Sequence, residues 1–140
     1  MNKISTPIEG TWVIAPRQFL DTRGFFSPLF SKQQFIDEKL CADFDRVNSS
    51  FSEKVGTLRG MHYQSSPYQE IKLIRVMQGS IWDVILDIRK DSPSYGKHFG
   101  VELNAQNRKM VYIPKGCAHG FITLTPNTEV LSVTEEDRLS

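Results

Sequence analysis

The sequence predicts an all-β domain, a sandwich or barrel, with one short helix near its N-terminus. Three observations support this. From Phe44 onward, apolar and polar residues alternate in short runs, which is typical of strands with one buried face. Gly and Pro turns separate these runs at an even spacing. Only the stretch from Ser31 to Leu40 carries a helical pattern instead.

The length, charge balance and cysteine content of the chain limit the class of protein. A chain of 140 residues is long enough for one domain with a real core, so we expect residues 1–140 to form a single domain. The 17 Lys and Arg residues nearly balance 16 Asp and Glu residues, which gives no electrostatic case for nucleic acid or membrane binding. No apolar run approaches the ~18 residues of a membrane span, and the N-terminus lacks the apolar core of a signal peptide. Two distant cysteines without a CxxC motif indicate a reduced, cytoplasmic chain.

The first third of the chain contains two short elements and the helix. Thr11 to Ile14 alternates like an edge strand, and Asp21 to Phe26 is a turn after which two aromatic residues should enter buried surroundings. In the helix, Ser31 suits the N-cap, with Gln34 three residues later as in a capping box. Its apolar face should cover a sheet edge.

The remainder of the chain consists of strand signals. Asn48, Ser50 and Ser52 alternate with their neighbours, so they share a face and are either anion donors or strand-end caps. Leu73 to Lys90 alternates around Gly79, which predicts two paired strands joined by a tight turn. In its second half, one face carries Trp82, Val84, Leu86 and Ile88, and the other carries Asp83 and Asp87. Further strands are expected at 99–103, 110–113 and from Phe121 onward.

Two stretches carry residues suited to chemistry. Gly56 to Lys72 contains Arg59, His62 and Lys72, and Ile113 to Phe121 contains His119. These are two of only three histidines in the chain, and glycines flank both of them, which allows close backbone approach to a ligand. We expect the two stretches to form the floor of one cationic pocket.

The residue types leave three interpretations of the two histidines open. A metal site would lack ligands. Gln64 stands where a second histidine is needed, two residues after His62, and Glu70 lies beside Lys72, whose ammonium would repel a cation. The groups needed for proton transfer next to a ketone are present, since a histidine can be the base, a lysine can hold the oxyanion and an arginine can hold a phosphate. Hydrogen-bonded core histidines without any catalytic role are the third interpretation.

A series of segments resembles the dTDP-4-dehydrorhamnose 3,5-epimerase family. The matches run in family order from about Asp21 to Leu124, and they are DTRGFF (21–26), LRGMHYQ (58–64), KLIRV (72–76), GSIWDV (79–84), DIRKDSP (87–93) and IPKGCAHGF (113–121). The resemblance implies a cupin-type jelly-roll β-barrel that needs no metal or other cofactor, and usually a homodimer. It also implies a nucleotide-linked 4-keto-6-deoxy sugar as substrate, inverted at C3, C5 or both.

The resemblance also implies a role for each site residue. His62 is the base and Lys72 stabilises the enolate, while Arg59, helped by Ser50 and Ser52, holds the diphosphate. Asn48 and His119 line the sugar pocket. Arg23 and Phe26 contact the nucleoside.

The sequence departs from the family at three points. The position of the family's catalytic tyrosine is Ser132, a shorter and far less acidic hydroxyl. Among the tyrosines, Tyr63 is turned away from the face of His62, and Tyr68 and Tyr112 have no assigned place. Family members usually continue past the position of Ser140, to an aspartate that supports the histidine. Pro28 replaces a glutamate near the nucleotide base, so the nucleotide stays open, with thymidine as the default.

Two functions follow from these observations. The first is an epimerase in which water or another residue supplies the acid. The alternative is a barrel that binds a nucleotide sugar in a sugar biosynthesis pathway without turning it over. Together, His62, Lys72, Arg59 and His119 favour the enzyme, because a mere binder has little use for a base beside an oxyanion site.

Overall fold

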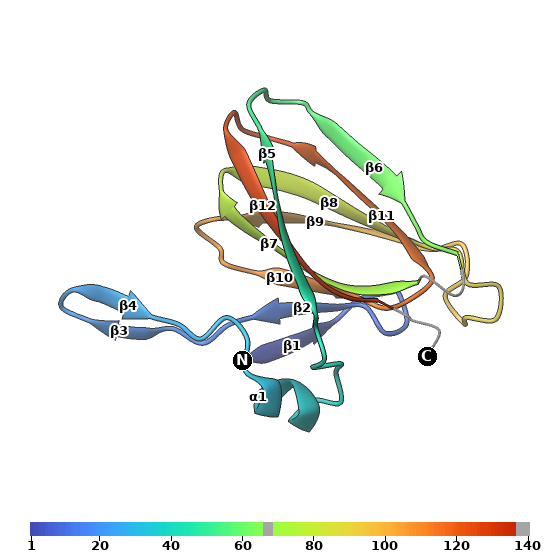
Figure 1. Ribbon diagram of the computed structural model, residues 1–140, viewed down its shortest axis with the longest axis horizontal. Coiled ribbons are helices and arrows are strands. Elements are labelled where there is room, and N and C mark those ends of the chain that lie inside the picture. The colour runs from blue at the N-terminus through green and yellow to red at the C-terminus, as the bar shows by residue number, and fades with distance from the viewer. Residues whose placement is uncertain (66–68, 137–140) are drawn as a thin grey trace.

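The computed structural model describes residues 1–65 and 69–136, and in this range the chain is almost entirely strand (Figure 1). The single described helix is α1, Lys32–Asp37. The strands, in chain order, are β1 (Asn2–Ser5), β2 (Trp12–Ala15), β3 (Phe19–Asp21), β4 (Gly24–Phe26), β5 (Arg46–Ser52), β6 (Leu58–His62), β7 (Glu70–Gln78), β8 (Ser80–Asp87), β9 (His98–Asn104), β10 (Met110–Ile113), β11 (Cys117–Thr123) and β12 (Thr128–Glu136). No helix in the described range is long and apolar enough to span a membrane.

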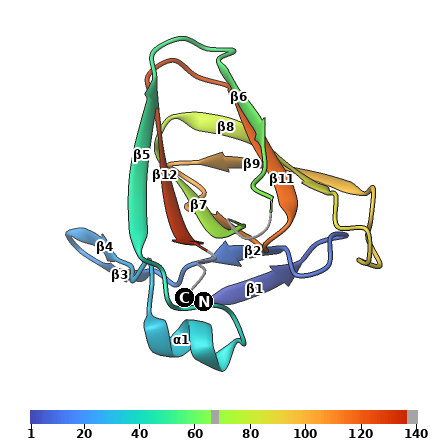
Figure 2. The same ribbon diagram turned by 45° about the vertical axis from the view of Figure 1, so that its right-hand side comes forward.

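Two sheets face each other around one core (Figure 2). The larger has the strand order β1-β2-β10-β7-β12-β5, and the smaller has the order β6-β11-β8-β9. Ile74 and Val130 of the larger sheet belong to the same buried cluster as Ile81, Ile85 and Phe121 of the smaller sheet. Such shared burial identifies the inner face of each sheet, and every second residue of a strand then lies on it. The two sheets form the cupin-type jelly roll that the family resemblance implied.

The predicted pairing of the two strands around Gly79 is wrong. β7 lies in the six-stranded sheet and β8 in the four-stranded sheet, so the chain changes sheets at Gly79 instead of forming a hairpin. Gly79 has a φ of +84°, and a Cβ there would lie 2.4 Å from Oγ1 of Thr128. Glycine is therefore required by both backbone conformation and space, at a corner of the barrel.

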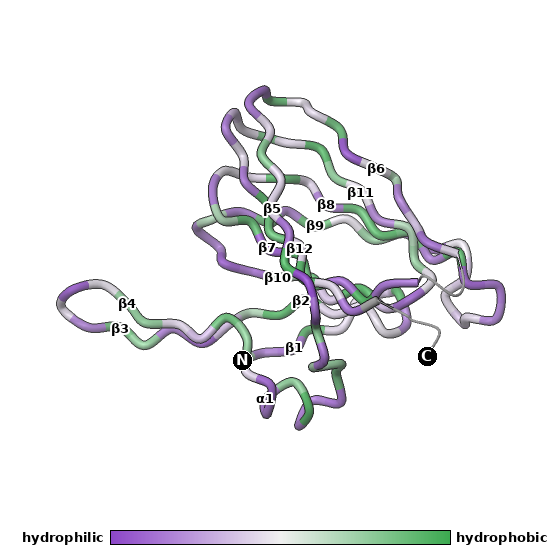
Figure 3. The backbone as a smooth tube through the Cα atoms, viewed as in Figure 1, coloured by the Kyte–Doolittle hydropathy of each residue, from purple (hydrophilic) through white to green (hydrophobic). Residues whose placement is uncertain are grey.

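The alternation along β8 is confirmed, and its acidic side is the inner one. Asp83 and Asp87 are fully buried, whereas Trp82 on the opposite face is 43% exposed. Figure 3 shows how polar and apolar segments follow one another along the barrel strands. Inward-facing carboxylates are costly unless other groups compensate them, so each of them calls for an explanation.

Helix α1 forms as its cap predicts, but it is shorter than expected. The Ser31 side chain accepts a hydrogen bond from the Gln34 amide, and Phe30 packs edge-on against Phe35 at 4.8 Å between ring centroids. The helix ends at Asp37 instead of near Leu40. The fully buried Phe35 clusters with outer-face residues of the larger sheet (Ile14, Leu73, Met110 and Tyr112). The helix therefore covers part of that outer face, and Lys3 of the edge strand β1 donates to the carbonyl of its C-cap Glu38.

The segment around Asp21 is an exposed hairpin, so the expectation that its aromatics are buried is wrong. β3 and β4 pair only with each other and extend away from the barrel (Figure 1). Phe25 and Phe26 are 46% and 69% exposed. The Arg108 guanidinium stacks on the Phe25 ring at 4.3 Å, which ties the hairpin to the turn before β10.

Candidate functional site

His62 and His119 are neighbours on the inner face of the smaller sheet. They are direct partners in the antiparallel pairing of β6 and β11, and His119 also pairs with the buried Ile85 of β8. Directly paired residues share a face, so both imidazoles belong to the inner side of the barrel wall. His119 is buried, whereas His62 is exposed and has no hydrogen-bond partner among residues 1–65 and 69–136. The two predicted stretches therefore meet as expected.

Lys72 lies on the inner face of the facing sheet. In β7 it alternates with the buried Ile74, and its partner in β10 is the buried Ile113. Its side chain is partly buried and makes no hydrogen bond or ion pair within the described part of the chain. An ammonium held in this way, on an apolar wall and without a counter-ion, is well placed to stabilise negative charge on a ligand.

The hydroxyl and amide residues lie on the same inner face as Lys72. Ser132 of β12 pairs with Ile74 on one side and with Asn48 of β5 on the other. Ser50 follows on β5, opposite the buried Val130. Asn48, Ser50 and Ser132 have no partner among the described residues, so the side chains available to a ligand line this part of the wall.

Arg59 joins the edges of the two sheets. Its Nε donates to Oγ of Ser52 at 3.1 Å, and its Nη2 donates to the backbone carbonyl of Phe51 at 3.0 Å. Ser52 is the last residue of β5 and Arg59 is on β6, so this guanidinium links the edge strands of the two sheets. The planar fork keeps further N–H groups for an anion, and Ser52 orients it.

Asp83 is the residue that the sequence interpretation did not include. Its Oδ1 lies 2.6 Å from Nε2 of His119, and both side chains are buried. The phase of β8 was the available signal, because Asp83 stands between Ile81 and Ile85 on the core side. Because carboxylates are usually exposed to water, Asp83 was not assigned to the inner face from the sequence alone. The histidine with a carboxylate partner in the described range is thus His119 and not His62.

Neither Tyr63 nor Tyr112 stands in for the family's tyrosine at the position of Ser132. Tyr63 follows β6 and is exposed. Tyr112 pairs with outer-face residues, and its hydroxyl accepts a hydrogen bond from the Cys41 amide at 3.0 Å. Tyr68 lies outside the described residues.

Arg23 and Phe26 lie apart from the other predicted site residues. They are on the exposed hairpin, where Arg23 donates to the Asp21 carboxylate at 2.8 Å and its side chain is 89% exposed. This ion pair holds the pKa of Asp21 below its ordinary value, mainly through the side-chain hydrogen bond from Arg23. The hairpin is therefore locally ordered, but within one chain it does not join the inner wall.

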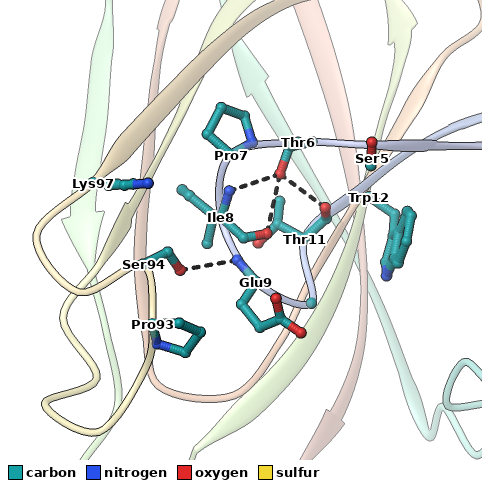
Figure 4. A pocket seen from close by; sticks show the side chains of 11 residues that line it. Ser5, Thr6, Pro7, Ile8, Glu9, Thr11, Trp12, Pro93, Ser94 and Lys97 are labelled. Atoms are coloured by element: carbon teal, nitrogen blue, oxygen red, sulfur yellow. Dashed lines mark hydrogen bonds between the residues drawn. The ribbon is translucent and has the colours of Figure 1, made fainter.

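Neither a metal cluster nor the hollow in Figure 4 competes with this site. In the described residues no three His, Cys, Asp or Glu side chains converge as metal ligands would, and Glu70 accepts hydrogen bonds from Arg46 and Gln64. The hollow lies between the β1–β2 loop and the loop after β8, and Thr6, Ser94 and the Glu9 amide bond to one another or to nearby carbonyls there (Figure 4). Its polar groups stabilise the loops themselves.

Comparison with known proteins agrees with this site. A model of the dTDP-4-dehydrorhamnose 3,5-epimerase family matches residues 5–138. The dTDP-4-dehydrorhamnose 3,5-epimerase of Shigella flexneri is 42% identical over 96% of this chain and 74% of its own length. The structure of the Bacillus anthracis enzyme of that name, with TDP and PPi bound, has a TM-score of 0.93 at 40% identity, over 99% of this chain and 79% of that one.

A third comparison includes the sugar. The structure of a dTDP-6-deoxy-D-glucose-3,5-epimerase from Legionella pneumophila in complex with dTDP-4-keto-L-rhamnose has a TM-score of 0.89 at 36% identity, over 99% of this chain and 73% of that one. The prediction of a jelly-roll epimerase for nucleotide-linked 4-keto sugars is thus confirmed, and the chain belongs to the dTDP-4-dehydrorhamnose 3,5-epimerase family.

Proposed function

We propose that this chain epimerises C3, C5 or both in a dTDP-linked 4-keto-6-deoxy sugar, with His62 as base and Lys72 as the enolate partner. The observation that carries the proposal is the opposition of an imidazole and an unpartnered ammonium on facing inner walls. The 4-keto group acidifies the hydrogens on both neighbouring carbons. A base on one wall and a cation on the other suit the removal of such a proton.

In the proposed reaction, the C–H bond breaks as its proton passes to the His62 imidazole. The electron pair moves into the carbon–carbon double bond of an enolate, whose oxygen the Lys72 ammonium stabilises. A proton delivered to the opposite face of the same carbon restores the ketone with inverted configuration. Because Ser132 is a poor acid, water is the proposed proton source, and the hydroxide that remains takes up the proton from His62, which restores the base.

Substrate binding is assigned to the remaining wall residues. Arg59 holds the diphosphate with Ser50 and Ser52, and Asn48 and His119 contact the sugar. Support comes from the side chains of Asn48 and Ser50, which have no partner among the described residues, and from the Arg59 bond to Ser52. TDP and PPi are bound in the Bacillus anthracis structure, which supports thymidine as the nucleoside.

Arg23 and Phe26 are proposed to contact the nucleoside bound to a second copy of the chain, in a homodimer. An exposed hairpin that extends from its own barrel can reach a ligand only in another molecule (Figure 1). A mixing experiment tests this. His62→Ala chains lack the base, and chains with Arg23→Ala and Phe26→Ala lack the hairpin contacts. Mixed dimers should regain activity that neither parent has, whereas additive residual activity contradicts exchange of the hairpin.

The deciding experiment for the reaction is incubation with a dTDP-4-keto-6-deoxy sugar in D₂O. Deuterium at C3 or C5 supports the epimerase. The alternative function, a barrel that binds a nucleotide sugar without turnover, is favoured by one observation, the serine at position 132. Saturable binding of the sugar without deuterium incorporation would establish that alternative.

Two broader proposals accompany this function. Residues 1–140 are proposed to act as one catalytic domain, and the cytoplasm is the proposed compartment. Cys41 and Cys117 are both free thiols, which fits a reducing environment.

A further inference from the structure

Asp83 occupies a place where an apolar side chain would serve the fold better. Its directly paired neighbours on the inner face are Phe121 and Val101, and Ile81 and Ile85 flank it along β8. The carboxylate is fully buried. Burying a charge costs several kcal/mol, and replacing a buried ion pair by apolar residues is often neutral or stabilising, by about 1–4 kcal/mol. Stability therefore does not explain the aspartate.

Among the described residues, the Asp83 carboxylate has one hydrogen-bond partner, a ring nitrogen of His119. Oδ1 lies 2.6 Å from Nε2 of His119, whereas Oδ2 is buried without a hydrogen-bond partner in the described residues. An ionised carboxylate only accepts hydrogen bonds, so Nε2 must carry the proton in this contact. The proton position of His119 is thus fixed by Asp83, as a neighbouring carboxylate commonly fixes the tautomer of an imidazole.

We propose that Asp83 is a positioning residue for His119, which keeps the imidazole proton on Nε2 and presents Nδ1 to the bound sugar. Nδ1 is the nitrogen without a partner in the described range. His119 sits directly beside the base His62 across the β6–β11 pairing, so a fixed ring defines which sugar oxygen can lie against it. This inference rests on the proposed function for the sugar contact, but the tautomer itself does not.

The main test is Asp83→Asn, read by ¹⁵N NMR of the ring nitrogens. An asparagine amide can donate to Nε2, so the proton should leave Nε2 and move to Nδ1, as happens when an aspartate beside a catalytic histidine becomes asparagine. The chain has three histidines, so comparison with a His119→Gln variant assigns the signals. With a dTDP-4-keto-6-deoxy sugar we expect kcat/KM to fall about 10- to 100-fold, the usual effect of a lost orienting partner.

A matched control separates positioning from folding. Asp87 is on the same strand, on the same inner face and equally buried, but its partners are Arg89, Ser92 and Ser94. Asp87→Asn should lower the melting temperature without changing the His119 nitrogens. Asp83→Leu should keep or raise the melting temperature while kcat/KM falls as in Asp83→Asn.

Two results would overturn the proposal. One is an unchanged protonated Nε2 signal in Asp83→Asn, and the other is a loss of melting temperature in Asp83→Leu as large as in Asp87→Asn. If the wild-type chain incorporates no deuterium into the sugar, the proposed function fails, and the NMR result still decides the role of Asp83 because it needs no substrate.

Discussion

Asp83 and Asp87 stand four residues apart on the inner face of β8, and both are fully buried, but their surroundings differ completely. Asp87 accepts hydrogen bonds from the backbone and side chain of Arg89 and from two serine hydroxyls, which satisfies both of its oxygens. Asp83 has the His119 ring on one oxygen and nothing in the described chain on the other. A satisfied buried carboxylate holds loops in place, whereas an incompletely satisfied one marks the part of the barrel kept for a ligand.

The same contrast separates two groups of side chains on the barrel. The groups that bond to Asp87 fasten the loop after β8. The exposed His62 and the partly buried Lys72 and Ser132, like Oδ2 of Asp83, have no hydrogen-bond partner among the described residues. Substitutions in the bonded group should therefore change stability, and those in the group without partners should change turnover.

The largest effect should come from His62, which has no bonded partner in the described range. Replacing His62 with alanine should lower deuterium incorporation at C3 or C5 by about 10³-fold, because a general base contributes about 10²–10⁴-fold. The exposed side chain should contribute within about 0.5 kcal/mol of stability, since it makes no contact that the fold needs. Exchange monitored by NMR, with urea unfolding in parallel, measures both. Equal exchange in His62→Ala and wild type removes His62 from the role of base.

Among the bonded groups, Asp87→Asn should lower the unfolding free energy by about 3 kcal/mol, because it breaks a buried charge pair with Arg89. Urea titration followed by fluorescence measures the change, and Asp83→Asn serves as the matched comparison. A cost for Asp83→Asn as large as that for Asp87→Asn would erase the distinction between the two carboxylates.

Acid should also act mainly through Asp87. Burial by itself would raise the pKa of this carboxyl, but hydrogen bonds from Arg89, Ser92 and Ser94 outweigh it and hold the pKa well below its ordinary value. A lowered folded pKa means that the contribution is present above the unfolded value near 4 and is lost as the pH falls below it, on the order of 2 kcal/mol in all. Wild-type stability should thus fall below about pH 4 more steeply than that of Asp87→Asn. Parallel slopes for the two proteins would contradict this assignment.

The smallest expected effect is a gain. Ser132 faces the inner wall beside Asn48 and Ile74, so Ser132→Tyr would place a phenol on the face that also carries Lys72. A positioned acid of pKa about 10 should raise epimerisation about 10-fold over the wild type, below the usual range for acid catalysis because the wall is not shaped around the ring. Ser132→Phe, which has the ring without the hydroxyl, is the control. A gain of the same size with phenylalanine would show packing to be the cause.

Much of the fold and of the inner wall could be predicted from the sequence. Alternation assigns residues to strand faces, so Asn48, Ser50 and Ser52 fall on one side, and glycine-flanked motifs bring His62 and His119 together. Alternation says nothing about which sheet a strand joins, so the corner at Gly79 was interpreted as a hairpin. Nor does it show which side is inner when that side carries charge, so Asp83 was missed. The exposure of Phe26 follows from tertiary placement, which no local pattern contains.

Through Arg59, the binding of an anion should be coupled to the contact between the two sheets. The guanidinium already links β5 to β6, so an anion bound to its remaining N–H groups would strengthen this link. Binding of the diphosphate at Arg59 should then slow amide hydrogen exchange along β5 and β6, at a distance from the reacting carbon of the sugar.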